Sequence, residues 1–173
     1  FDFDHLSSSA AQFNTEKLNW LNNHYIREAD NGRLEALVGP QLEKMGVRLD
    51  QGPALQDVIG LMKDRVNTVN ELANASLMFY MEPDPDPELV KEHLTDEARA
   101  ALKEYAANIE KIEWDREALK VMMKGVLKQN KLKMPQVAMP LRLFLTGQLH
   151  TPSIDAVVCL FGRETVLSRL KDL

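Results

Sequence analysis

The sequence predicts an all-α protein, a multi-helix bundle of about ten helices arranged in two sub-modules. Apolar residues recur at spacings of three and four along most of the chain, which is the period of an amphipathic helix. Capping residues precede these stretches, and glycines or prolines follow them. No stretch alternates between apolar and polar residues as a half-buried strand does. With 173 residues and 45% hydrophobic content, the chain can bury a substantial core.

Three helices and a further apolar stretch are expected in the first half of the chain. Asn14 or Thr15 can cap the first helix, because either side chain can accept a hydrogen bond from a free backbone N–H of the first turn. Asp30 precedes the second helix, which Gly46 ends. The third begins near Pro53. The apolar side of the first helix consists of Leu18, Leu21, Tyr25 and Ile26.

A proline-rich segment, Glu82–Pro87, interrupts the helical pattern. Its alternating prolines remove hydrogen-bond donors and favour extended geometry in the residues before them. We therefore expect a boundary here, with one helical sub-module over residues 1–82 and a second over residues 88–173.

Three helix starts are expected after this segment. Thr95 and Asp115 can each cap a helix through their side chains. Residues 151–152 are the third start, in which the threonine is the capping residue and the proline takes the first helical position.

Another helix is expected to begin at Pro135 and to end at Gly147. Pro140 falls inside it, where the ring removes one backbone donor and clashes with the preceding turn. The sequence therefore predicts a kink or a break near Met139.

Charge is distributed unevenly. The chain has a formal net charge of −5, yet residues 118–154 contain six Lys or Arg and no Asp or Glu. Residues 121–173 hold 8 basic and 3 acidic residues, a balance of +5, which leaves −10 for residues 1–120. A local positive field on an acidic molecule is expected of a surface that meets phosphate. A solvated helix face would give the same pattern.

Four lysines of this tract are spaced for one face of a helix. The spacing i, i+4, i+8 and i+11 is that of Lys120, Lys124, Lys128 and Lys131. Lys133 and Arg142 extend the basic surface onto the next helix. From charge and spacing, we expect the phosphate-binding residues to be Lys124, Lys128, Lys131 and Lys133.

No catalytic constellation is recognisable in the sequence. The four histidines lie far apart, and none has ligand spacing with a cysteine or another histidine, so no metal site is expected. The sequence contains no nucleophile elbow, Gly-rich phosphate loop or dinucleotide fingerprint. These observations favour a binding module over an enzyme.

The single cysteine, Cys159, lies in the apolar run 157–161, where we expect a buried and unreactive thiol. One cysteine forms no disulfide within the chain, which fits a reducing, cytoplasmic compartment. No stretch approaches the roughly 18 apolar residues of a membrane span. The chain begins with Phe1 rather than methionine, so we expect a fragment of a longer protein.

Unpaired nucleotides are recognised by arginine planes, apolar contacts and backbone groups. Arg65 is a candidate for such an arginine, and the helix starts at Pro135 and at residues 151–152 offer free N–H groups. We expect Trp20 and Trp114 to be core anchors rather than stacking platforms.

Three segments resemble bacterial glutamyl-tRNA synthetases. Residues 17–27, KLNWLNNHYIR, resemble that family's KLxWxNxxYIR stretch, and residues 137–147, VAMPLRLFLTG, resemble its VAxPLRxxLTG stretch. Residues 150–164 are similar to the TPxLFE…LLGKE region near the family's carboxyl terminus. The segments occur in the family's order and together extend over almost the whole chain.

The resemblance implies the carboxyl-terminal anticodon-binding region of such an enzyme, an all-helical fold of the superhelical type. The family's class I catalytic domain uses ATP and Mg²⁺ and carries a His-Ile-Gly-His type signature and a Lys-Met-Ser-Lys type loop. Neither occurs in this sequence. We therefore expect the parent protein to be an ATP-dependent glutamate–tRNA ligase, and this fragment alone to be inactive, without catalytic residues and without a cofactor.

The resemblance also assigns residues to the anticodon. In the family, an arginine in a segment like residues 61–68 reads the third anticodon base, a cytosine. Contacts to the first two bases come from the loop that matches residues 151–154. This sequence has Ile154 where the family more often has leucine, and Asp155 where phenylalanine is common. The anticodon-binding residues implied in this way are Arg65, Arg142, Thr151, Pro152 and Ile154.

The expected partner is tRNA(Glu), with neither DNA nor a membrane involved, and the fragment is expected to be a monomer. The alternative function is a helical protein-interaction module without an RNA role, in which the lysine face meets an acidic protein.

Overall fold

A computed structural model describes residues 14–171 and Leu173, and within them the chain forms ten α-helices, three short 3₁₀-helices and no strand. The all-α prediction is therefore confirmed. The first elements are α1 (Thr15–Glu28), α2 (Asn31–Lys44), η1 (Leu49–Gln51), α3 (Leu55–Met62), η2 (Lys63–Arg65), α4 (Val69–Ser76) and η3 (Leu77–Phe79). They are followed by α5 (Pro87–His93), α6 (Asp96–Ile109), α7 (Arg116–Gln129), α8 (Met134–Thr146), α9 (Ile154–Phe161) and α10 (Arg163–Leu170).

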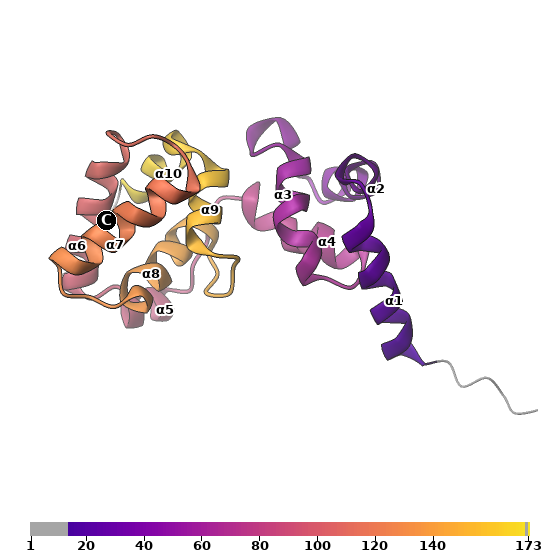
Figure 1. The fold of residues 1–173 in the computed structure, drawn as a ribbon, viewed down its shortest axis with the longest axis horizontal. Coiled ribbons are helices and arrows are strands. Elements are labelled where there is room, and N and C mark those ends of the chain that lie inside the picture. The colour runs from indigo at the N-terminus through magenta and orange to yellow at the C-terminus, as the bar shows by residue number, and fades with distance from the viewer. Residues whose placement is uncertain (1–13, 172) are drawn as a thin grey trace, which may run out of the picture.

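The helices lie in two groups, α1 to α4 and α5 to α10, joined by the proline-rich segment (Figure 1). None of the helices in the described part of the chain is long and apolar enough to span a bilayer.

Four of the predicted helix caps are confirmed, because each side chain accepts a hydrogen bond from a backbone N–H of the first turn. The caps are Asn14 for α1, Asp30 for α2, Thr95 for α6 and Asp115 for α7. Two further side-chain caps were not predicted. The Thr68 hydroxyl accepts a hydrogen bond from the Glu71 N–H at the start of α4. Asp86 accepts one from the Glu88 N–H, and Pro87 takes the first position of the short helix α5. The proline-rich segment therefore leads directly into a helix.

Helix α8 contains the internal proline that was expected to disturb it. It runs without a break from Met134 to Thr146, so a break near Met139 is wrong, and the alternative of a kink there stays a prediction. Pro140 is buried within a run of buried apolar residues, and packing on both sides of the proline holds the helix together although one backbone hydrogen bond is missing. The predicted end is confirmed, since Gly147 has a φ of 71°, a left-handed conformation that favours glycine.

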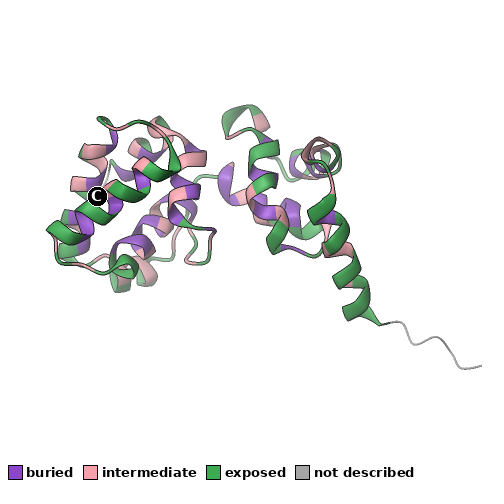
Figure 2. Cartoon of the chain, viewed as in Figure 1, coloured by how far each residue is buried: buried purple, intermediate pink, exposed green. Residues whose placement is uncertain are grey.

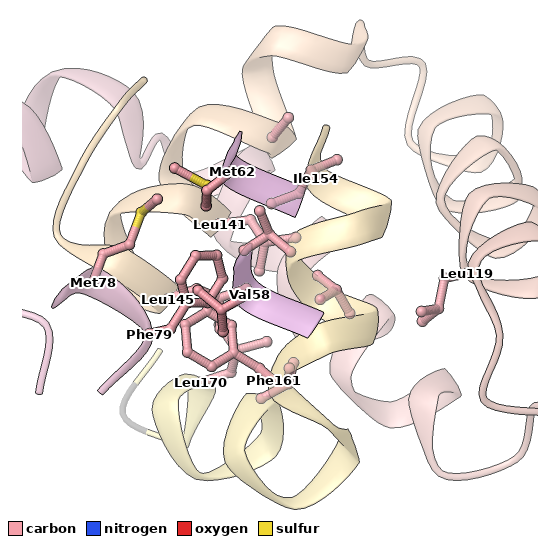
Figure 3. Packing of buried hydrophobic residues seen from close by; sticks show 14 of the residues in the cluster. Val58, Met62, Met78, Phe79, Leu119, Leu141, Leu145, Ile154, Phe161 and Leu170 are labelled. Atoms are coloured by element: carbon pink, nitrogen blue, oxygen red, sulfur yellow. The ribbon is translucent and has the colours of Figure 1, made fainter. Parts of the chain in front are cut away.

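One hydrophobic core extends through both groups of helices (Figures 2 and 3). Helix α3 packs against α9, and Val58 and Met62 of α3 lie beside Leu141 of α8 and Ile154 of α9 (Figure 3). The rings of Phe79 and Phe161 are 5.3 Å apart between centroids. Because the core is shared across it, the boundary between residues 1–82 and 88–173 stays a prediction.

A half-buried arginine links the second group of helices to the segment that follows the first. The guanidinium of Arg169 in α10 donates hydrogen bonds to the backbone oxygens of Leu145 and Met81 and lies over the Phe161 ring, 4.4 Å from its centroid. Burial lowers the pKa of Arg169, and the charge of Glu82 opposes that shift. Through its two hydrogen bonds, the Arg169 side chain satisfies two backbone carbonyl oxygens that have no partner within a helix.

The apolar face of α1 is not buried as expected. Leu18 and Leu21 are 39% and 40% exposed, and Trp20 is 68% exposed. The prediction that Trp20 is a core anchor is therefore wrong. Helix α1 projects away from the other helices (Figure 1), so only its last turn, with Ile26, reaches the core.

Trp114 and Cys159 lie close together and are both half-buried. The indole N–H of Trp114 donates a 3.0 Å hydrogen bond to the Cys159 backbone oxygen, which confirms Trp114 as an anchor. The Cys159 thiol borders a cleft of about 450 Å³, so the prediction of a fully buried thiol is wrong. Partial burial still raises the pKa of this thiol, which makes it a poor nucleophile.

Candidate nucleic-acid interface

Arg142 and Thr151 are in direct contact across the turn between α8 and α9. The Arg142 Nε donates a 2.9 Å hydrogen bond to the Thr151 Oγ1, and that hydroxyl donates to the Pro152 backbone oxygen at 3.0 Å. One terminal nitrogen of Arg142 lies 3.8 Å from the Met139 sulfur. The guanidinium is thus fixed by its inner nitrogen, and its outer edge carries no strong acceptor.

Arg65 lies near this arginine although 77 positions separate the two in the sequence. It ends η2, the turn that follows α3, and its side chain is exposed. Burial lowers the pKa of Arg142, and the positive charge of Arg65 lowers it further. Within residues 14–171, no ion pair involves either guanidinium.

Two neighbouring cations without a counter-ion are an unfavourable arrangement that an added acceptor relieves. Guanidinium groups offer planar, forked donors, which match phosphate oxygens and the acceptor edges of bases. The pair formed by Arg65 and Arg142, together with the Thr151 hydroxyl, is therefore suited to an anionic or strongly accepting ligand. We refer to these three residues as the arginine site.

The predicted helix start at residues 151–152 is wrong in detail. Helix α9 begins at Ile154, and Ser153 occupies the capping position. The Thr151 hydroxyl is engaged by Arg142 and by the Pro152 carbonyl, so it caps no helix. The predicted start at Pro135 is shifted by one residue, since Met134 is the first residue of α8.

The side chains of Pro152 and Ile154 face inward. Both residues are buried, and Ile154, which is 8% exposed, belongs to the hydrophobic core beside Met62 (Figure 3). Little of either side chain is left for a ligand to touch. Their effect on the site is to fix the path of the backbone between Thr151 and α9.

A charged contact at the start of α9 was missed by the sequence analysis. Arg116 donates two hydrogen bonds to the Asp155 carboxylate, at 3.0 and 2.9 Å, and one to the Ser153 hydroxyl at 3.2 Å. Burial raises the pKa of Asp155, but these hydrogen bonds lower it by more, so the net shift is downward. Nothing in the sequence indicates that Arg116 and Asp155, which are 39 positions apart, are in contact. Because α9 already carries this carboxylate in its first turn, its start is a less favourable phosphate site than predicted.

The lysine row predicted for one helix face is shorter than expected. Helix α7 ends at Gln129, so Lys131 lies outside it and adopts a positive φ of 54°. The Leu132 N–H reaches back to the Leu127 oxygen at 2.9 Å and the Lys131 N–H to the Lys128 oxygen at 3.3 Å. This is the hydrogen-bond pattern of a Schellman motif, which ends a helix by a left-handed residue. The prediction that Lys131 continues the helix face is wrong.

The remaining lysines are exposed. Lys120 pairs with Glu117 at 3.6 Å. The described part of the chain shows no ion pair for the other four lysines, which leaves their ammonium groups to solvent. These are Lys124, Lys128, Lys131 and Lys133.

Nothing in the described residues is arranged for metal chemistry, because no group of three or more His, Cys, Asp or Glu side chains comes together there. The site consists of donors and cations only, which can bind and orient an anionic ligand.

The chain is similar to known proteins over nearly its whole length. A family model described as an anticodon binding domain matches residues 33–173. A glutamate–tRNA ligase of Janthinobacterium sp. (strain Marseille) is 58% identical over 170 residues, a match that covers 98% of this chain and 37% of that protein. A glutamate–tRNA ligase of Herminiimonas arsenicoxydans is 55% identical over 170 residues, covering 98% of this chain and 36% of that protein.

The fold is also similar to a solved structure. The crystal structure of a glutamate tRNA ligase from Elizabethkingia meningosepticum in complex with its amino acid superimposes with a TM-score of 0.83 at 26% sequence identity. That match covers 99% of this chain and 34% of the other. The chain thus spans little more than a third of the length of the relatives it matches.

Proposed function

The chain belongs to the anticodon-binding domain family, and on that premise we propose that it recognises the anticodon loop of tRNA(Glu) as part of a glutamate–tRNA ligase. The observation that carries the proposal is the arginine site: Arg142 donates to the Thr151 hydroxyl, the positive charge of Arg65 acts on Arg142, and neither guanidinium forms an ion pair within residues 14–171. The bases of an anticodon loop are unpaired and expose their acceptor edges, which are the groups that fixed guanidinium planes bind.

In the ligase, this recognition selects the tRNA. Binding energy gained at the anticodon favours the cognate tRNA over others in the step that the catalytic part of the protein performs. The parent protein, acting in the cytoplasm, joins glutamate to tRNA(Glu). ATP and Mg²⁺ belong to its catalytic part, and the residues described above contribute binding and orientation. The 173-residue chain by itself is a monomer without aminoacylation activity.

Replacing Arg65 by alanine tests the proposal. We expect discrimination at the third anticodon base to fall by about 1–3 kcal/mol, because a guanidinium donates to the acceptor edge of one base and finds no equivalent acceptors on another. The measurement is equilibrium binding to anticodon stem-loops that carry cytosine or another base at that position. Arg48→Ala is the control, since it removes an equal charge from an exposed arginine that pairs with Asp50. Equal discrimination in the Arg65→Ala variant and the parent chain would contradict the assignment, and the absence of any RNA sequence preference would favour the protein-interaction alternative.

The four exposed lysines give a second prediction. Each of Lys124, Lys128, Lys131 and Lys133 is expected to neutralise one phosphate. The slope of log affinity against log salt is negative, and replacing all four lysines by glutamine should make it less steep by about 2.8, at roughly 0.7 per contact. The discrimination between anticodon sequences should stay as it was, since phosphate contacts carry no base information. Binding titrations at several salt concentrations measure both quantities, and an unchanged slope would show that the lysines face solvent only.

A further inference from the structure

The turn that carries Arg65 is held on both sides by α1. The side-chain amide of Asn23 donates a 2.6 Å hydrogen bond to the Val66 backbone oxygen. The Lys63 ammonium donates a 3.0 Å hydrogen bond to the Ala29 backbone oxygen at the end of α1. Helix α1 and η2 pack against each other along this line. The residues on either side of Arg65 are therefore fastened to α1, while no hydrogen bond or ion pair within residues 14–171 holds the Arg65 side chain.

We propose that Asn23 is a positioning residue for Arg65, and so determines how well the arginine site discriminates between bases. Asn23 touches no ligand in this proposal. It fixes the carbonyl that follows Arg65, and with it the backbone from which the guanidinium extends. The proposal rests on the proposed function, because it concerns the accuracy of base recognition by Arg65.

The hydrogen bond from Asn23 gives the turn firmer support than the exposed ion pair beside it does. This hydrogen bond is partly buried and short. It satisfies the Val66 backbone oxygen, which lies at the end of η2 and has no partner within a helix. The third link, between Arg27 and Asp64 at 3.3 Å, joins side chains that are 57% and 64% exposed. Exposed ion pairs of this kind contribute little and are screened by salt. A short, partly buried hydrogen bond between uncharged groups, in contrast, depends little on salt concentration.

The adjacent residue supplies a matched control. Asn22 is the same residue type on the same helix and makes no side-chain hydrogen bond to the turn at residues 63–66 in the described structure. Asn23→Ala removes the amide, and Asn23→Asp keeps its shape but replaces the donor by a carboxylate that only accepts. Asn22→Ala removes an amide that the turn does not use.

The experiment measures binding of the 173-residue chain to stem-loops with cytosine or uracil at the third anticodon position. For Asn23→Ala and Asn23→Asp we expect the ratio of the two affinities to fall about two- to tenfold, the effect of one hydrogen bond, with no change for Asn22→Ala. In an Arg65→Ala background, Asn23→Ala should change the ratio no further, because its effect acts through Arg65. An equal loss of affinity for both RNAs, or an unchanged ratio, overturns the proposal.

A second readout separates this proposal from the proposed function. Amide hydrogen exchange at residues 64–68, measured without RNA, should become faster in Asn23→Ala than in Asn22→Ala. If Arg65→Ala itself leaves discrimination unchanged, the role of Arg65 in base recognition fails, whereas faster exchange would still support Asn23 as the residue that holds this turn. Unchanged exchange overturns the positioning role whatever the RNA data show.

Discussion

Replacing Phe79 by alanine is expected to lower the free energy of unfolding by about 3–5 kcal/mol, the usual cost of removing a buried phenylalanine. Phe79 is 1% exposed, and its ring packs against Phe161 with 5.3 Å between the ring centroids. It ends η3 in the first group of helices, whereas Phe161 ends α9 in the second (Figure 3). The substitution therefore opens a cavity at the point where the two groups share their core.

Urea unfolding followed by far-ultraviolet circular dichroism measures this effect. Met81→Ala is the control, because Met81 lies two residues further along, is 55% exposed and should cost less than about 0.5 kcal/mol. If Phe79→Ala costs no more than Met81→Ala, the shared core described above is wrong. A split into two transitions in Phe79→Ala would show that this contact couples the two groups.

Replacing Arg142 by alanine is expected to weaken binding of the anticodon stem-loop by about 2–4 kcal/mol, as for other arginines at the centre of an interface. The substitution removes a half-buried cation and also the 2.9 Å hydrogen bond that holds the Thr151 hydroxyl. The loss of binding free energy should be larger than for Arg65→Ala. Arg142 contributes its own charge and also holds the protein loop before α9 through Thr151.

Arg142→Lys distinguishes charge from geometry. Lysine keeps the positive charge but offers no planar fork that can bond Thr151 and a ligand together. We therefore expect it to restore the salt dependence of binding and not the full affinity. Titrations of both variants at two salt concentrations provide the measurement. Complete recovery by lysine would mean that the site recognises charge alone, and Arg142→Ala binding within twofold of the parent chain would remove Arg142 from the site.

The helices could be predicted from the sequence because their signals are local. A capping side chain reaches a backbone N–H two or three residues away, and Asn14, Asp30, Thr95 and Asp115 all do so in the structure. The end of α8 is also a local feature, because Gly147 readily adopts the left-handed conformation that ends a helix. A local signal failed at residues 151–152: the threonine hydroxyl accepts a hydrogen bond from Arg142, and α9 begins only at Ile154.

The site was predictable only in its list of residues. The resemblance to a known family named Arg65, Arg142 and Thr151. Nothing in the sequence states that Arg142 contacts Thr151, or that the charge of Arg65, 77 positions away, acts on Arg142. The packing of α3 against α9 decides that arrangement, because it carries the turn after α3 to the loop before α9. The exposure of Trp20 has a related cause: an amphipathic face is buried only where another element covers it, and in the described residues α1 is covered at its last turn alone.

The amino-acid sequence by itself therefore determined the helical class, several helix ends and the uneven charge, since each depends on neighbours within a few residues or on composition. The tertiary structure decided which cations lie together without a counter-ion, which lysine leaves its helix and which residues hold Arg65 in place. Those features depend on how helices pack, and packing is a property of many distant side chains acting together.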